Sequence, residues 1–413
     1  MTVHPSPNQP SARFIALMAF MFSLVAISID MMLASLPDMG RELSPDAPQN
    51  AQLVLSVFFV SLGLATAFAG PIADAFGRRP LVLWGLMLYA IGAALSWFAP
   101  TIETMVMGRA LQGFGAAAPR VAGMAVIRDR FEGSAMARTL SLVMMIFTLI
   151  PGVAPLLGEF VAYMAGWRAI FLVFMGVAAL VWVWFFLQQP ETLPADKHRP
   201  LRFGTWFHEV LEVLANNQTR RALFAQLFVF ASLYSFLTAA AFVFDETLQL
   251  DGAFPYVIGA MSLSGAASSY LNARIVETRG ILPIMRVALA VWLGICVLGA
   301  AVIVLGADGW TLRAAFIGVM WSSFLVLGLT IGNSNALAMH PMGHIAGTAA
   351  ATVTSISTLG AGMLSLPVAM AFDGTARPLI IGTTCFAALA LYFTLRISPS
   401  ASEPQPSRPD HAL

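Results

Sequence analysis

The sequence predicts an all-α integral membrane protein, with twelve transmembrane helices in two pseudo-symmetric six-helix bundles. Of its 413 residues, 58% are hydrophobic and 10% are charged, whereas a soluble protein carries about 25% charged residues. Twelve apolar runs are each long enough to cross a hydrocarbon core about 30 Å thick. One long polar connection, residues 188–220, divides the runs six and six. This pattern excludes a soluble enzyme with a large core.

The N-terminal bundle is predicted within residues 13–187. Its first run follows a segment rich in Pro and Ser, residues 1–12, and is too long for the core of a signal peptide, so we expect it to remain as a spanning helix. Polar or Pro/Gly clusters, such as 37–50 and 76–80, separate successive runs. The expected spans, in order, are 13–36, 51–70, 81–99, 104–127, 139–163 and 167–187.

The C-terminal bundle is predicted within residues 221–396, and the tail 397–413, rich in Pro and Ser, is expected to be disordered. Asp245 and Glu246, which end the first of its runs, are expected to be solvated. The expected spans, in order, are 221–244, 254–276, 282–305, 311–332, 345–371 and 377–396.

Apolar residues recur at helical spacing in the connection between the bundles. This spacing indicates a short amphipathic helix on the membrane surface, and a plain linker is the alternative. The residues are Trp206, Phe207, Val210, Leu211 and Leu214.

The distribution of positive charge predicts the orientation. An even number of spans places both termini on one side, and by this map 16 Lys and Arg residues lie on that side. Because positive loops stay in the cytoplasm, both termini are expected to be cytoplasmic. The opposite side carries four such residues: Arg41, Arg168, Arg313 and Arg377.

Composition also argues against several functions. The net charge of +1 gives no basic field for nucleic acid. The single lysine, Lys197, lies outside any GxxxxGK loop, so the chain lacks a P-loop. Cys296 and Cys385 lie in apolar runs and are interpreted as small hydrophobic residues rather than a disulfide or a metal site. We therefore expect no enzyme activity, metal or cofactor.

Three ionisable residues lie deep within the predicted spans: Asp30, Arg109 and Arg120. Each costs about 2.5–3.5 kcal/mol in a bilayer, so each needs a partner, a wet cavity or a function. Arg109 and Arg120 are three helical turns apart and share one face, with Gln112 one turn from Arg109. We expect these four residues to line a cavity, with Asp30 carrying a proton and Arg109 modulating its proton affinity. A permanent Asp30–Arg109 pair, and an Arg120 that reaches the interface, are the alternatives.

Two segments resemble the major facilitator superfamily. GPIADAFGRRPLVLWG at 70–85 resembles the signature loop between its second and third helices, and MGRALQGFGAAA at 107–118 resembles the fourth-helix motif of its proton-coupled members. Asp74 is expected to cap another helix or to pair with Arg128 or Arg130, as a gate; a solvated charge is the alternative. The matching residues of the loop are Gly70, Asp74, Gly77, Arg78 and Arg79.

A third segment, PGVAPLLGEF at 151–160, resembles the antiporter motif of the fifth helix. Gly152, Pro155 and Gly158 are expected to permit a bend and tight packing. Glu159 stands where the motif usually has a second glycine. It puts the close packing in doubt, or faces the external vestibule as a second acid.

Three further segments are similar to the bicyclomycin-resistance (Bcr/CflA) branch of drug:proton antiporters: the Asp30 segment, Asn272-Ala-Arg274 and the run from Gly347. The resemblance implies proton-driven export of small, often apolar or cationic compounds, drugs included, by alternating access across a bacterial inner membrane. The expected partners are the substrate, protons and the bilayer, and a monomer suffices. The alternatives are an exporter of one metabolite, such as an amino acid, sugar or siderophore, and a non-transporting sensor or scaffold.

Overall fold

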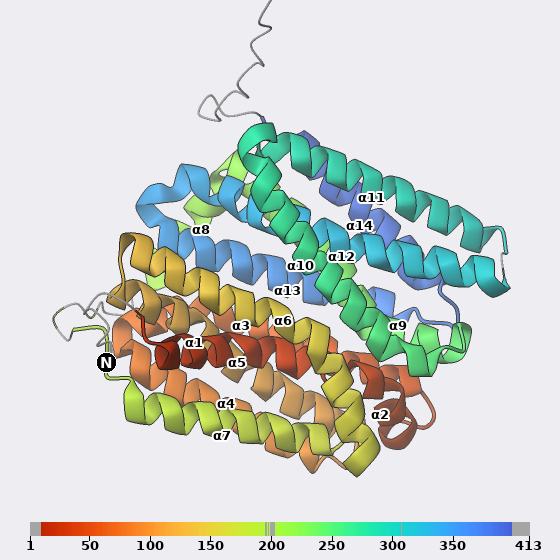
Figure 1. The fold of residues 1–413 in the computed structure, drawn as a ribbon, viewed down its shortest axis with the longest axis horizontal. Coiled ribbons are helices and arrows are strands. Elements are labelled where there is room, and N and C mark those ends of the chain that lie inside the picture. Colours follow the sequence, from red (N-terminus) through yellow and green to blue (C-terminus); the bar gives the residue numbers. More distant parts are fainter. Residues whose placement is uncertain (1–9, 195, 197, 199–202, 307, 399–413) are drawn as a thin grey trace, which may run out of the picture.

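The computed structural model describes residues 10–194, 196, 198, 203–306 and 308–398, and this part of the chain folds into helices without strands (Figure 1). Twelve long helices within it form the two predicted halves. The N-terminal half holds α1 (Ala12–Asp30), α3 (Gln52–Phe76), α4 (Arg78–Trp97), α5 (Ile102–Arg130), α6 (Gly133–Ala165) and α7 (Ala169–Gln188). The C-terminal half holds α9 (Asn217–Phe242), α10 (Phe254–Arg279), α11 (Ile281–Val304), α12 (Gly309–Met339), α13 (Ala346–Met370) and α14 (Arg377–Leu395).

The connections between the long helices, two of which contain the short helices α2 and α8, reverse the chain, so they lie at two ends of the molecule. We call the end that carries Gly77 to Arg79 the motif end, and the end that carries Arg41 and Asp245 the opposite end. In Figure 1 the long helices run from left to right, with α8 (Phe203–Ala215) toward the motif end and α2 (Leu36–Leu43) at the opposite end.

Nine segments of the described residues are long and apolar enough to cross a membrane, and one of them, Gly309–Met370, contains both α12 and α13. These segments account for ten of the long helices, and α5 and α10 are the other two. Helix α5 carries Arg109 and Arg120 within its length. Its low hydropathy follows from a polar face that packs on protein rather than lipid.

The prediction of one helix over residues 13–36 is wrong. Helix α1 ends at Asp30, and the chain continues through a 3₁₀ turn, η1 (Leu33–Ser35), into α2 and a second 3₁₀ turn, η2 (Pro48–Ala51). Segment η1 contacts α6 of its own half and also α9 and α10 of the other half. Asp30 therefore lies at a helix end, beside the junction of the two halves.

The connection between the halves contains α8, which packs against α9 and α13 and brings Trp206 against Phe68 of α3. Residues 195, 197 and 199–202 of this connection lie outside the described part. At the C-terminus, Ile397 is buried and its carbonyl accepts a hydrogen bond from Arg286. The described structure therefore extends past residue 397, where the tail was predicted to begin. Residues 399–413 lie outside the described part.

The halves meet along two helix pairs, α3 with α13 and α6 with α10. A Cβ built on Gly63 of α3 would lie 2.5 Å from the backbone nitrogen of Leu359. The Ser355 hydroxyl donates a 2.7 Å hydrogen bond to the Gly63 carbonyl. On the other pair, a Cβ on Gly259 would lie 2.9 Å from the carbonyl oxygen of Gly152. Small residues thus let the helices approach backbone to backbone.

Candidate functional site

Arg109 is completely buried and holds the end of α1. Its guanidinium donates to the Gln112 side chain at 2.5 Å and to the Ser28 carbonyl at 3.0 Å. Its central carbon also lies 4.3 Å from the centre of the Phe58 ring. Because the last carbonyls of a helix lack partners within the helix, the arginine caps the C-terminal end of α1.

Asp30 lies two residues beyond Ser28 and retains 8% of its surface. Within the described part of the chain, its carboxylate forms no ion pair, either with Arg109 or with another cation. The contact of Arg109 with α1 is through the Ser28 backbone instead. Asp30 and Arg109 thus lie in the same region without forming an ion pair. The alternative of a permanent Asp30–Arg109 pair is wrong for this structure.

Arg120 lies on the same helix as Arg109 in a different environment. Protein surrounds it, and it interacts electrostatically with Tyr234 of α9, yet its side chain keeps exposed surface. Thr358 of α13 shares a hydrogen bond with Tyr234. Arg120 therefore faces the C-terminal half rather than lipid.

Exposure along this face of α5 changes from one end to the other. Gly113 and Ala117 are buried, whereas Arg120, Met124 and Arg128 are exposed at successive turns. Arg128 also lies near the other half, because a Cβ on Gly347 would lie 4.0 Å from its guanidinium. Exposed side chains of α5 thus lie toward the motif end, which indicates a solvent-filled crevice beside α5 that Arg128 and Gly347 border.

The opposite end is closed by contacts between segments from both halves. Arg41 of α2 forms a 2.9 Å ion pair with Asp245, at the end of α9. The expectation that Asp245 is merely solvated is therefore wrong.

A Cβ on Gly158 of α6 would overlap the carbonyl oxygen of Met31, just after Asp30. The antiporter motif thus keeps its close packing.

The remaining motif residues of α6 differ in role. Gly152 packs against α10, where a Cβ would lie 2.7 Å from the Leu263 side chain, and Pro155 is buried inside the helix. Glu159 is exposed near the opposite end. It does not disturb the packing of Gly158, because it points away from that contact.

At the motif end, the expected pairing of Asp74 with Arg128 or Arg130 is wrong. Asp74 forms a 2.8 Å ion pair with Arg78, which is nearly buried, and Arg78 also lies 3.3 Å from Asp129 of α5. Arg130 lies over the Phe14 ring instead. Asp74 and Asp129 thus hold Arg78 between α3 and α5.

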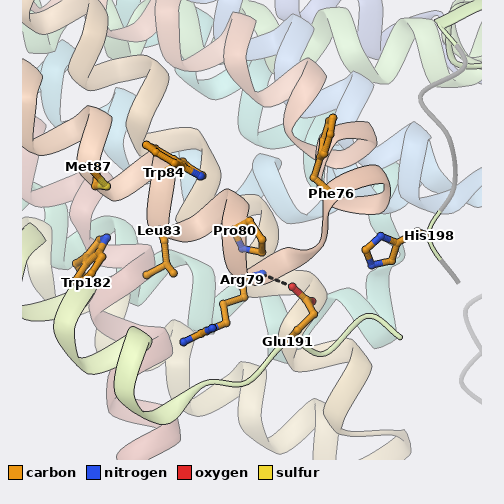
Figure 2. Close-up of a pocket in the computed structure, with 9 residues that line it drawn as sticks. All are labelled: Phe76, Arg79, Pro80, Leu83, Trp84, Met87, Trp182, Glu191 and His198. Atoms are coloured by element: carbon orange, nitrogen blue, oxygen red, sulfur yellow. Dashed lines mark hydrogen bonds between the residues drawn. The ribbon is translucent and has the colours of Figure 1, made fainter. Parts of the chain in front are cut away.

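The cap of α4 is Glu191, a residue of the connection after α7 that the sequence analysis missed. Its carboxylate accepts a 3.0 Å hydrogen bond from the backbone nitrogen of Arg78 and a 2.9 Å hydrogen bond from that of Arg79, of which Figure 2 draws the second. Partial burial opposes ionisation, but these bonds and two from its own loop together lower the pKa of Glu191. Gly77 has φ of +98°, and a Cβ there would lie 2.5 Å from the carboxylate. A glycine is needed on both counts.

The hollow in Figure 2, about 450 Å³, lies on the outer flank of the N-terminal half, between α4 and α7. Arg79 lies along it and donates a 2.9 Å hydrogen bond to the Phe186 carbonyl. A second, smaller hollow continues along the same flank. Neither includes Asp30, Arg109 or Arg120, so the exposure of Arg120 is the observation that supports the predicted cavity. Gly70, the first residue of the loop motif, has no atom within 4 Å of a built Cβ.

The comparisons with known proteins agree with this architecture. The sequence pattern of the Major Facilitator Superfamily matches residues 18–365. The bicyclomycin resistance protein homolog of Haemophilus influenzae is 29% identical over 396 residues, which cover 94% of this chain and 97% of that protein. Multidrug resistance protein MdtL of Escherichia coli is 33% identical over 187 residues, or 45% of this chain and 47% of that protein.

The fold has also been seen in solved structures. The human organic anion transporter MFSD10 (TETRAN) superposes with a TM-score of 0.68 at 18% identity, covering 94% of this chain and all of that one. At this identity the likeness concerns the fold. The sequence match, the two helical halves and the packed helix pairs agree, and the chain belongs to the Major Facilitator Superfamily of membrane transporters.

Proposed function

We propose that the chain is a proton-coupled antiporter that exports small organic compounds, drugs included, across a bacterial inner membrane by alternating access. The observation that carries the proposal is Asp30, a buried carboxyl group without an ion-pair partner among the described residues, at the break of α1. The multidrug and bicyclomycin-resistance relatives support the substrate class. The positive-inside rule supports a cytoplasmic motif end.

Asp30 is placed to couple protons to the movement of the halves. Burial without a partner disfavours the charged form of a carboxyl group, and contact with water favours it. The adjoining η1 touches α9 and α10, so rearrangement of the halves changes the surroundings of Asp30. Each proton that enters down the membrane potential contributes about 2.3 kcal/mol per 100 mV.

Arg109 is a positioning residue in this proposal. It binds the Ser28 carbonyl and so fixes the end of α1, two residues before Asp30. Arg41 and Asp245 hold the opposite end closed in this structure and must separate when that end opens.

The test is flux in proteoliposomes that contain the purified chain, driven by a pH gradient, with a panel of unrelated small compounds. Asp30→Asn is nearly isosteric and should abolish gradient-driven export, while Asp46→Asn, at an exposed position, should leave it unchanged. Competition among unrelated compounds supports a drug exporter, and transport of a single compound supports the metabolite exporter instead. Undiminished gradient-driven export by Asp30→Asn would remove Asp30 from the mechanism.

A further inference from the structure

Arg120 has no function in the proton mechanism, and its environment is unusual. It is an arginine in the middle third of the membrane-embedded α5, exposed to the crevice. No carboxylate of the described residues forms an ion pair with it. An unpaired guanidinium at this depth is costly, and such residues commonly serve substrate or ion binding.

The charges along α5 do not neutralise Arg120. Arg109 lies about 16 Å away along the helix and Arg128 about 12 Å away in the other direction, so both axial neighbours on this face are cations. From the other half, the ionisable neighbour is the neutral phenol of Tyr234. Asp30 of α1 forms no ion pair with Arg120. The crevice therefore presents a positive charge with an open position for an anion.

An apolar wall stands beside this charge. The Tyr234 ring lies parallel to the Phe59 ring, with centres 3.7 Å apart, and to the Phe230 ring, with centres 5.8 Å apart. Phe59 belongs to the N-terminal half, so the stack crosses between the halves. Phe59 has no exposed surface and Tyr234 is buried, so the partly exposed Phe230 ring is the part of the stack that an aromatic or apolar body can contact.

We propose that the compounds exported by this site are small organic anions, whose acidic group binds Arg120 and whose apolar body lies against Phe230, the partly exposed ring of the stack. This inference rests on the proposed export function and narrows its substrate class, in place of the cationic compounds that the family resemblance implies. Arginine suits the role because its planar fork matches carboxylate and sulfonate oxygens.

The proposal has an electrical consequence. When one monovalent anion leaves in exchange for one entering proton, two positive charges move inward in each cycle. An inside-negative potential therefore accelerates the export of an anion. Exchange of a monovalent cation for one proton moves no net charge and does not respond to the potential.

The experiment uses three probes with one ring system: 1-naphthalenesulfonate, 1-naphthalenesulfonamide and 1-naphthylmethylammonium. Flux is measured in proteoliposomes with the potential set by potassium and valinomycin. The sulfonate should be exported fastest and should respond to the potential. Arg120→Gln should lower kcat/KM for the sulfonate by about tenfold or more, and Arg120→Lys should restore part of it. Arg138→Gln, which removes an exposed charge of α6, should change neither.

Export of the ammonium or the amide with exclusion of the sulfonate, unaffected by Arg120→Gln, would overturn the anion site and leave the exporter intact. If no probe moves, the export function fails for these compounds, and equilibrium dialysis of the sulfonate against the solubilised full chain decides the site. Sulfonate binding that Arg120→Gln weakens about tenfold supports the site, and absence of binding overturns it.

Discussion

Two arginines on one face of α5 have opposite surroundings. Arg109 is completely buried, donates to Gln112 and the Ser28 carbonyl, and caps α1. Arg120, three turns closer to the motif end, has exposed surface and no ion-pair partner in the described part of the chain. The difference shows that α5 passes from a fully packed region into one where solvent reaches its side chains.

The same substitution at both positions should separate the two roles most clearly. Arg109→Lys keeps a buried charge but loses the fork that reaches two acceptors, so it should lower the free energy of unfolding by about 3 kcal/mol. Arg120→Lys should change this free energy by less than about 0.5 kcal/mol. Unfolding of the detergent-solubilised protein measures both. If the two substitutions lowered the free energy of unfolding equally, the two regions of α5 would not differ in packing as described.

A second prediction concerns the packed region between the halves. Gly63→Ala places a methyl group against the backbone of Leu359 and should force α3 and α13 apart, at a cost of about 1–3 kcal/mol. Gly176→Ala of α7 is the matched control, because no atom lies within 4 Å of its built Cβ. Transport and thermal unfolding of both variants provide the measurement. A Gly63→Ala variant as active and stable as the control would show that close approach here is dispensable.

A third, smaller effect is expected at the opposite end. Asp245→Asn removes the ion pair with Arg41, which is half exposed, so the closed arrangement should lose about 0.5–1 kcal/mol. The population with a separated opposite end should rise about two- to fivefold. Distances between spin labels on α2 and on the α13–α14 connection measure it. Asp46→Asn, at an exposed position between α2 and η2, is the control, and identical distance distributions in the two variants would contradict the role of the pair.

The smallest effect is expected at Glu191. Its folded-state pKa lies below the ordinary value of 4.5, so its stabilisation is present above about pH 4.5 and is lost as the pH falls through the folded pKa. Because Glu191 is exposed, Glu191→Gln should cost less than about 1 kcal/mol at pH 7. Unfolding followed from pH 7 to pH 3 measures the difference, which should shrink toward low pH. A difference that grows on acidification would contradict the cap.

Helix number and order could be predicted from the sequence, because an apolar run of about 20 residues is the length that a helix needs to cross the hydrocarbon core. The shared face of Arg109 and Arg120 also follows from their spacing. Their different surroundings do not, since these depend on where α1 ends and where α9 approaches. The break after Asp30 has no Gly or Pro beside it, so nothing local predicts it.

Contacts between distant parts of the chain explain the wrong predictions. Asp74 pairs with Arg78, one turn away along the chain, while Asp129 rather than Arg128 or Arg130 reaches the same arginine. Glu191 lies more than a hundred residues along the chain from the backbone nitrogens that it caps. Tyr234 appears in an ordinary apolar run, and the approach of α9 to α5 alone places it beside Arg120.

The central claim is that Asp30 carries the proton that substrate displaces. Proton release is measured with a pH indicator in weakly buffered, detergent-solubilised protein on addition of a compound that the flux panel has identified as a substrate. We predict release by the wild-type chain, equal release by Asp46→Asn, and none by Asp30→Asn, which should still bind the compound. Undiminished proton release from Asp30→Asn would contradict the account.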